Sequence, residues 1–166
     1  MAKAAIDQAE GLRRLLSRDA LRIITVVSAT AGVGKTSAVI NLAVALARAG
    51  REVLILDESP RRNNVSDSLG INARFDLLDV INSKKSLEQV LVPGPEGISV
   101  LPAAHGVRRL AGLDKDDQHR LIGCFNRLAN PVGVVLVDTA TENSSMALPA
   151  SIVAHDVMVV LSRSTS

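Results

Sequence analysis

The chain has 166 residues, of which 47% are hydrophobic, 22% are charged and 1% are aromatic, and its net charge is +2. This length and hydrophobic content suit the core of one globular domain, and so small a net charge gives no argument for a nucleic-acid-binding protein. A single cysteine, Cys124, excludes an internal disulfide and favours a reducing compartment. Because we find neither a signal peptide nor an apolar run of membrane-spanning length, we expect a cytoplasmic protein.

The N-terminal arm, residues 1–21, differs from the rest of the chain in charge. Residues 1–22 carry five basic and three acidic side chains, whereas the remaining residues balance fourteen against fourteen. The apolar residues of the arm recur every three or four positions, as in one stripe of a helix. They are Ile6, Ala9, Leu12 and Leu16. Such a stripe can pack on its own domain or bind a partner, and the residues alone favour neither.

After the arm, β-branched runs alternate with helical patterns along the chain. In chain order, the patterns predict a strand over 21–28, a helix over 35–50 closed by Gly50, and a strand over 52–57. Short helices over 63–70, 75–83 and 86–92 follow, then a turn over 93–97 and a strand over 97–103. The last predicted elements are a helix over 115–130, a strand over 132–138, a helix over 144–155 and a strand over 156–162. This order predicts one α/β domain, residues 22–166, with a doubly wound, mainly parallel sheet flanked by helices.

The residues that could carry chemistry stand at the carboxyl ends of predicted strands, where doubly wound sheets place their sites. The segment after the first strand supplies the second half of a phosphate-binding loop, GxxxxGK[ST], with Ala29 at the first glycine position. Its residues are Gly32, Val33, Gly34, Lys35, Thr36 and Ser37. In such loops backbone N–H groups surround the phosphates, the lysine neutralises them and the hydroxyl binds magnesium.

Two aspartates, Asp57 and Asp138, each close a hydrophobic predicted strand. An aspartate at a strand end commonly caps the following turn, so either residue alone has an ordinary structural explanation. Opposite a phosphate loop, the pair favours association with magnesium or with the attacking water, together with Thr36.

Longer segments resemble a known family. AGVGKTSAVINLAVALARAGREVLILD, VLVDTA and DVMVVLS resemble the deviant Walker A ATPases of the MinD/ParA family, and residues 66–106 are similar to the FlhG (FleN) group of flagellar-number regulators. The arm sequence DQAEGLRRLL is similar to that group's DQAxxLR element, which stimulates FlhF, a GTPase of the signal-recognition-particle type. The resemblance implies a MinD-like P-loop fold, ATP or ADP with magnesium as ligands, and FlhF as partner. The implied partner-binding residues are Ile6, Asp7, Gln8, Ala9, Leu12, Arg13 and Leu16.

Four positions depart from the family's pattern. Against the family loop KGGVGKT, Thr30 replaces the signature lysine that reaches the partner's nucleotide, and Ala31 replaces a glycine. Ser59 replaces the water-positioning aspartate of the DxD motif, and Glu142 replaces the glycine of the DxxxG switch. These departures imply a degenerate ATP site, with weak or no nucleotide binding, no assignable catalytic residue and a monomeric chain.

The chain stops at LSRSTS, before the further strands and membrane helix of the family, so we expect a truncated chain or a short paralogue without membrane association. The leading hypothesis is a regulator of flagellar number or placement that presents its arm to FlhF, with flagellar transcription activators or switch proteins as further partners. One alternative is an active ATPase that dimerises with ATP. Another is a ParA-like partition protein, which would need a basic nucleic-acid-binding surface.

Overall fold

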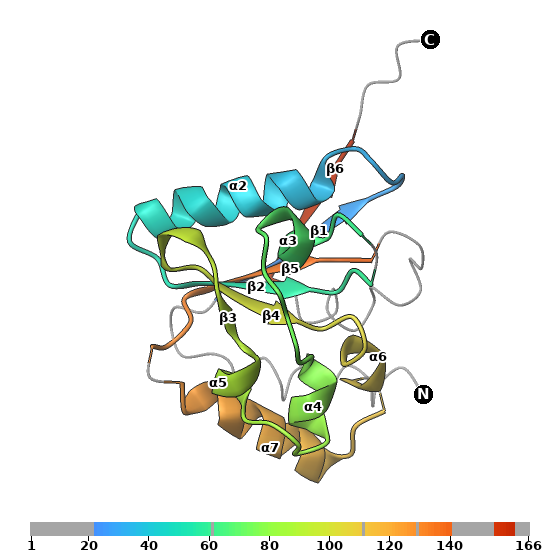
Figure 1. Cartoon of the computed structure of the whole chain (residues 1–166), viewed down its shortest axis with the longest axis vertical. Helices are drawn as coiled ribbons and strands as arrows, with labels where there is room; N and C mark the ends of the chain where they lie inside the picture. The colour runs from blue at the N-terminus through green and yellow to red at the C-terminus, as the bar shows by residue number, and fades with distance from the viewer. Residues whose placement is uncertain (1–21, 61, 111, 129, 141–154, 162–166) are drawn as a thin grey trace.

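The computed structural model describes residues 22–60, 62–110, 112–128, 130–140 and 155–161 (Figure 1). The N-terminal arm and Glu142 lie outside these ranges, as does the predicted helix over 144–155 apart from His155. The predictions made for those residues therefore stay predictions.

Six strands form one sheet. They are β1 (Arg22–Ser28), β2 (Val53–Asp57), β3 (Val92–Pro93), β4 (Ser99–Pro102), β5 (Val134–Asp138) and β6 (Asp156–Val160). Their order is β3-β4-β2-β5-β1-β6, and only the pairing of β3 with β4 is antiparallel. Valine and isoleucine dominate the central strands, as expected where both faces of a parallel sheet are covered. The predicted mainly parallel sheet is confirmed.

Seven helical segments connect or follow the strands in the described part of the chain. They are α2 (Lys35–Arg48), α3 (Val65–Ser68), α4 (Leu77–Ile81), α5 (Leu87–Val90), the 3-10 helix η1 (Pro95–Gly97), α6 (Val107–Leu110) and α7 (Lys115–Asn126). Two elements, β3 and α6, were not predicted, because two and four residues are too few to show a hydrophobic period. Among these helices, none is long and apolar enough to span a bilayer.

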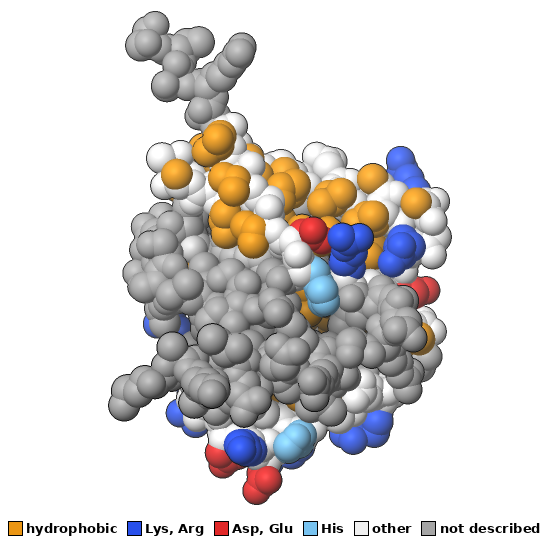
Figure 2. All heavy atoms as spheres, turned by 180° about the vertical axis from the view of Figure 1, so that it is seen from behind, with side chains coloured by type: hydrophobic (Ala, Val, Ile, Leu, Met, Phe, Trp, Pro, Cys, Tyr) orange, Lys and Arg blue, Asp and Glu red, His pale blue; other side chains and the backbone are white. Residues whose placement is uncertain are grey.

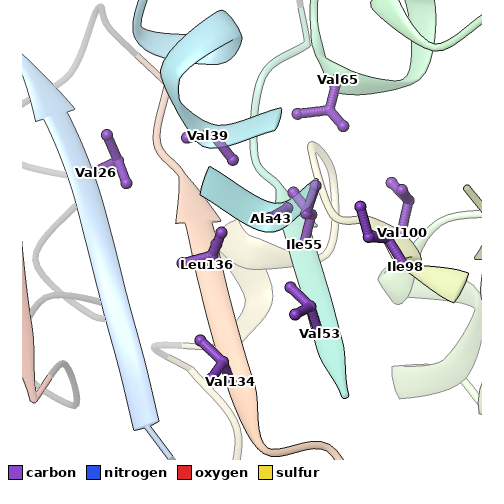
Figure 3. Close-up of a cluster of buried hydrophobic side chains, with 10 residues drawn as sticks. All are labelled: Val26, Val39, Ala43, Val53, Ile55, Val65, Ile98, Val100, Val134 and Leu136. Carbon is purple, nitrogen blue, oxygen red and sulfur yellow. The ribbon is translucent and has the colours of Figure 1, made fainter. Parts of the chain in front are cut away.

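The sheet separates two hydrophobic cores, because successive residues of a strand face opposite sides. Val53 and Ile55 of β2 pack with Val134 and Leu136 of β5 on the side of α2 (Figure 3). Leu54 of β2 instead packs on the opposite side, with residues of α4, α5 and α7. Figure 1 shows α2 on one side of the sheet and these three helices together on the other. The flanking helices thus complete the doubly wound arrangement.

Two glycines let the chain turn or approach closely. Gly50, with φ 81°, follows the end of α2, where its N–H donates to the Ala47 carbonyl at 2.9 Å, so the predicted helix stop is confirmed. Gly106 lies against α4, where an added Cβ would stand 2.6 Å from the Cβ of Leu77. The Asp76 carboxylate, which caps α4, also accepts the Gly106 N–H at 2.8 Å. The loop after β4 is thereby fixed to the start of α4.

Strand β6 forms one edge of the sheet and exposes an apolar row. Val157, Val159 and Leu161 are 54%, 57% and 74% exposed, and their alternate spacing places them on one side of the strand. Figure 2 shows hydrophobic side chains gathered in the upper part of the face seen there. An exposed row at a sheet edge is a surface against which another chain segment can pack.

Candidate functional site: the carboxyl ends of β1, β2 and β5

The loop between β1 and α2 has the geometry of an anion-binding helix start. Gly32 and Gly34 have φ 77° and 87°, values that side-chain-bearing residues rarely adopt. Gly34 is the N-cap of α2, no side chain caps this end, and the first turn contains no acidic residue. The N–H groups of residues 35–37 are therefore left at the positive end of the helix dipole, which favours an anion.

Lys35 is buried at this helix start and contacts β5 and the residue that follows it. Its Nζ donates hydrogen bonds to Oδ1 of Asp138 and to the carbonyl oxygen of Thr139. Thr36 donates from Oγ1 to the other carboxylate oxygen of Asp138 at 2.7 Å. Lys35 is 6% exposed and Asp138 is 0% exposed, so the two charges neutralise each other away from water. The structure thus brings three of the predicted site residues into direct contact.

Asp57 lies opposite Asp138 in the pairing of β2 with β5, but its carboxylate bonds elsewhere. Oδ2 accepts from the backbone N–H and the hydroxyl of Ser66, both at 3.2 Å, and Oδ1 accepts from the Ser59 N–H at 3.3 Å. Burial raises the pKa of Asp57 to about 6; Asp138 raises it further, and the hydrogen bonds from Ser66 and Ser59 oppose this. Asp57 therefore has a structural role at the start of α3 beside its predicted association with magnesium.

Sequence reasoning missed Glu58, a third carboxyl group at this site. The residue is 3% exposed, and among the described residues its Oε1 has no hydrogen-bond partner. Burial raises the pKa of Glu58 to about 7; Asp138 and Asp57 also raise it, while Lys35 and the Ala140 N–H lower it. The signal available in the sequence was an acid directly after the strand-ending Asp57. The ammonium group of Lys35 thus interacts with two carboxyl groups, those of Asp138 and Glu58.

The substituted family positions that the structure describes are Thr30, Ala31 and Ser59. Thr30 and Ala31 are exposed in the loop, and the Thr30 carbonyl accepts from Ser28 Oγ at 3.1 Å. Ser59 is half-buried, and its carbonyl accepts from Asn64 Nδ2 at 3.2 Å. The structure therefore shows uncharged side chains at all three positions.

The residues present fit a nucleoside phosphate with magnesium in two respects. The uncapped start of α2 supplies N–H donors, and the hydroxyl of Thr36 and the carboxylate of Asp138 are the oxygen ligands that magnesium prefers. Within the described ranges, no three His, Cys, Asp or Glu side chains converge as a self-contained metal centre. A magnesium ion here would thus depend on phosphate oxygens and water for most of its ligands, as it commonly does.

The chain is similar in sequence and in fold to known proteins. A family model described as an AAA domain matches residues 21–165. The antiactivator FleN of Pseudomonas aeruginosa is 33% identical over 150 residues, covering 90% of this chain and 54% of FleN. The chain spans about half the length of several curated relatives that it matches.

Two solved structures illustrate the shared fold. Cobyrinic acid a,c-diamide synthase from Mycobacterium smegmatis, with a bound ATP analogue and magnesium, is 26% identical with a TM-score of 0.68 over 85% of this chain and 60% of that one. MinD in the MinC:MinD complex of Aquifex aeolicus is 25% identical with a TM-score of 0.63, covering 83% and 55%. From the family match and these likenesses, the chain belongs to the MinD/ParA-type ATPase family.

Proposed function

We propose that this chain is a MinD-like regulator that binds a magnesium nucleotide weakly and does not hydrolyse it. The observation that carries the proposal is the buried contact of Lys35 with Asp138 and Thr139, in which a phosphate-binding lysine is occupied by groups of its own chain. To contact a phosphate, Lys35 must leave Asp138, whose buried charge then needs another cation. A bound magnesium ion would supply that cation. We therefore expect the nucleotide to bind weakly and only together with magnesium.

The substituted positions support the absence of hydrolysis. Thr30 is too short and uncharged to stabilise a neighbouring nucleotide's phosphates, so ATP-dependent dimerisation is not expected. Ser59 offers a hydroxyl where a carboxylate would orient water, and loss of one such group costs orders of magnitude in rate. The names of the similar proteins, an antiactivator and a MinD bound to MinC, also support a regulatory role.

The first prediction concerns nucleotide binding. Calorimetric titration with Mg-ADP should give a dissociation constant of about 1 mM rather than micromolar. EDTA should abolish the heat, because without magnesium the buried Asp138 carboxylate keeps Lys35 from the phosphates. Thr36→Val should weaken nucleotide binding further. The matched control is Thr25→Val, a buried residue within β1, which should leave binding unchanged. ATP turnover should equal background. Micromolar affinity, or turnover that Thr36→Val abolishes, would contradict a degenerate site.

The proposal extends to the N-terminal arm, residues 1–21, as the element that acts on an FlhF-like GTPase. Its support is the similarity of DQAEGLRRLL to the family's activating element and the positive charge concentrated in the arm. Gly11 within the apolar stripe weakens an isolated helix by about 1 kcal/mol, which suits a segment that becomes helical on its partner. On this proposal, activation needs no nucleotide bound to the α/β domain.

The second prediction tests the arm directly. GTP turnover by FlhF should rise with the whole chain and with a peptide of residues 1–20, and should not rise with a chain that begins at Ala20. Thr36→Val should leave stimulation intact, because the arm acts without the phosphate site. Equal stimulation by the shortened chain would show that the α/β domain, rather than the arm, activates the GTPase.

A further inference from the structure

A cavity of about 310 Å³ opens between α4, α5 and α7, in the helical layer on the other side of the sheet from α2. Its apolar walls include Val80, Ile81 and Leu121. In the described part of the chain, four cationic side chains also line it, against one carboxylate, that of Asp117. These four are Lys84, Lys85, Arg120 and Arg127, and we call the cavity the basic pocket. Its size is within the range of ligand sites.

The positive charges are held in place but only partly neutralised. Arg120 pairs with Asp117 at 2.9 Å and donates from the same Nη2 to the Ile81 carbonyl at 2.9 Å. Lys84, Lys85 and Arg127 make no ion pair within the described ranges of the chain.

Two of these three cations instead have uncharged neighbours. Lys85 lies 4.3 Å from the centre of the Phe75 ring, and Arg127 Nη2 donates to Cys124 Sγ at 3.4 Å. The pKa of exposed Glu88 is lowered by its own backbone N–H and by Ser86, and to a smaller extent by Arg127. The pocket therefore concentrates positive charge, although residues 23–166 as a whole carry equal numbers of basic and acidic side chains.

A strained turn presents the two lysines. Ser83 has φ 57°, in the left-handed region that Gly50 also occupies after α2. Its N–H donates to the Val80 carbonyl at 3.0 Å, and the Lys84 N–H donates to the Asp79 carbonyl at 2.8 Å, as in a glycine-terminated helix. A serine in this conformation costs energy, and such strain concentrates at functional sites. The backbone of this turn therefore fixes the positions from which the side chains of Lys84 and Lys85 extend.

We propose that the basic pocket binds an acidic peptide segment of a partner protein. Among the described residues no aromatic side chain lines it, so these residues give no stacking platform for a nucleotide base. Arg120 Nη2 already donates to Asp117 and Ile81, and Arg127 Nη2 donates to Cys124, so fewer paired N–H groups are left for a compact phosphate. Apolar walls beneath separate cations suit a peptide that carries both carboxylates and apolar side chains. The pocket residues named above are separate from those of the phosphate site.

The chain contains its own reporter, because Cys124 is its single cysteine and lines the pocket. The rate at which Cys124 reacts with a small neutral disulfide should fall when octaglutamate is added, and added salt should restore it. Fluorescence anisotropy of labelled octaglutamate measures the same binding without the thiol. The double variant Lys84→Glu with Lys85→Glu should weaken binding at least about tenfold.

The matched control is Arg108→Glu with Arg109→Glu, which reverses two adjacent exposed charges on α6 outside the pocket. This control should bind octaglutamate like the unchanged chain, and octaserine should not protect Cys124. Three results would each overturn the proposal: no protection by octaglutamate, equal loss in the control, or pyrophosphate protecting as well as octaglutamate. The last would assign the pocket to a compact anion instead.

Discussion

Replacing Lys35 with methionine is expected to lower the free energy of unfolding by about 3–5 kcal/mol, because Asp138 then stays buried without its cation. The carboxylate is 0% exposed, so water cannot solvate it, and of its two described side-chain partners only the Thr36 hydroxyl would remain. Urea unfolding followed by circular dichroism at pH 7.5 measures the loss, since the chain has no tryptophan or tyrosine for fluorescence. EDTA keeps metal ions from substituting for the lysine.

The double variant Lys35→Met with Asp138→Asn separates the lost pair from lost packing. Removing both charges should recover most of the stability, because a buried pair of ions contributes little net energy although each ion alone is costly. An exposed cation on the same helix, Arg48, provides the control Arg48→Met, whose surface pair with Glu96 should contribute about 1 kcal/mol or less. A loss below about 1 kcal/mol in Lys35→Met would show that Asp138 is not buried as a charge.

Replacing Glu58 with glutamine should flatten the dependence of stability on pH. The pKa of Glu58 rises from 4.5 to about 7 on folding, so between these values the folded chain holds a proton that the unfolded chain releases. Stability from this group is therefore fully present below about pH 4.5 and is lost as pH rises through about 7. The size is on the order of 3 kcal/mol. Asp57, raised to about 6, acts in the same direction over a lower range.

Glutamine imitates the protonated acid, so Glu58→Gln should match the unchanged chain at pH 5 and exceed its stability at pH 8. Urea unfolding at half-unit steps between these pH values gives both curves. Glu52→Gln makes the same change at an exposed position just before β2 and is the control, because it should leave the dependence of stability on pH unchanged. If the curves of the unchanged chain and of Glu58→Gln stay parallel, Glu58 does not take up a proton on folding.

The sequence by itself determined those strands and helices that depend on local residue patterns. Runs of valine and isoleucine predicted five of the six strands, and a 3.6-residue period closed by Gly50 predicted α2. The order of these elements implied a parallel sheet. In that topology the phosphate loop, Asp57 and Asp138 all follow or close the carboxyl ends of neighbouring strands. Backbone preference and strand order are enough for these conclusions.

Only the tertiary structure decided which side chains contact one another at the carboxyl ends of these strands. Strand alternation places Glu58 on the other face from Asp57, yet the chain leaves β2 there, and Glu58 is buried near Lys35 and Asp138. The basic pocket likewise unites the α4–α5 turn with α7, segments about thirty residues apart with no shared pattern. Burial, charge pairing and raised pKa values depend on such distant contacts, because they are set by the distances between side chains after packing and not by spacing along the chain.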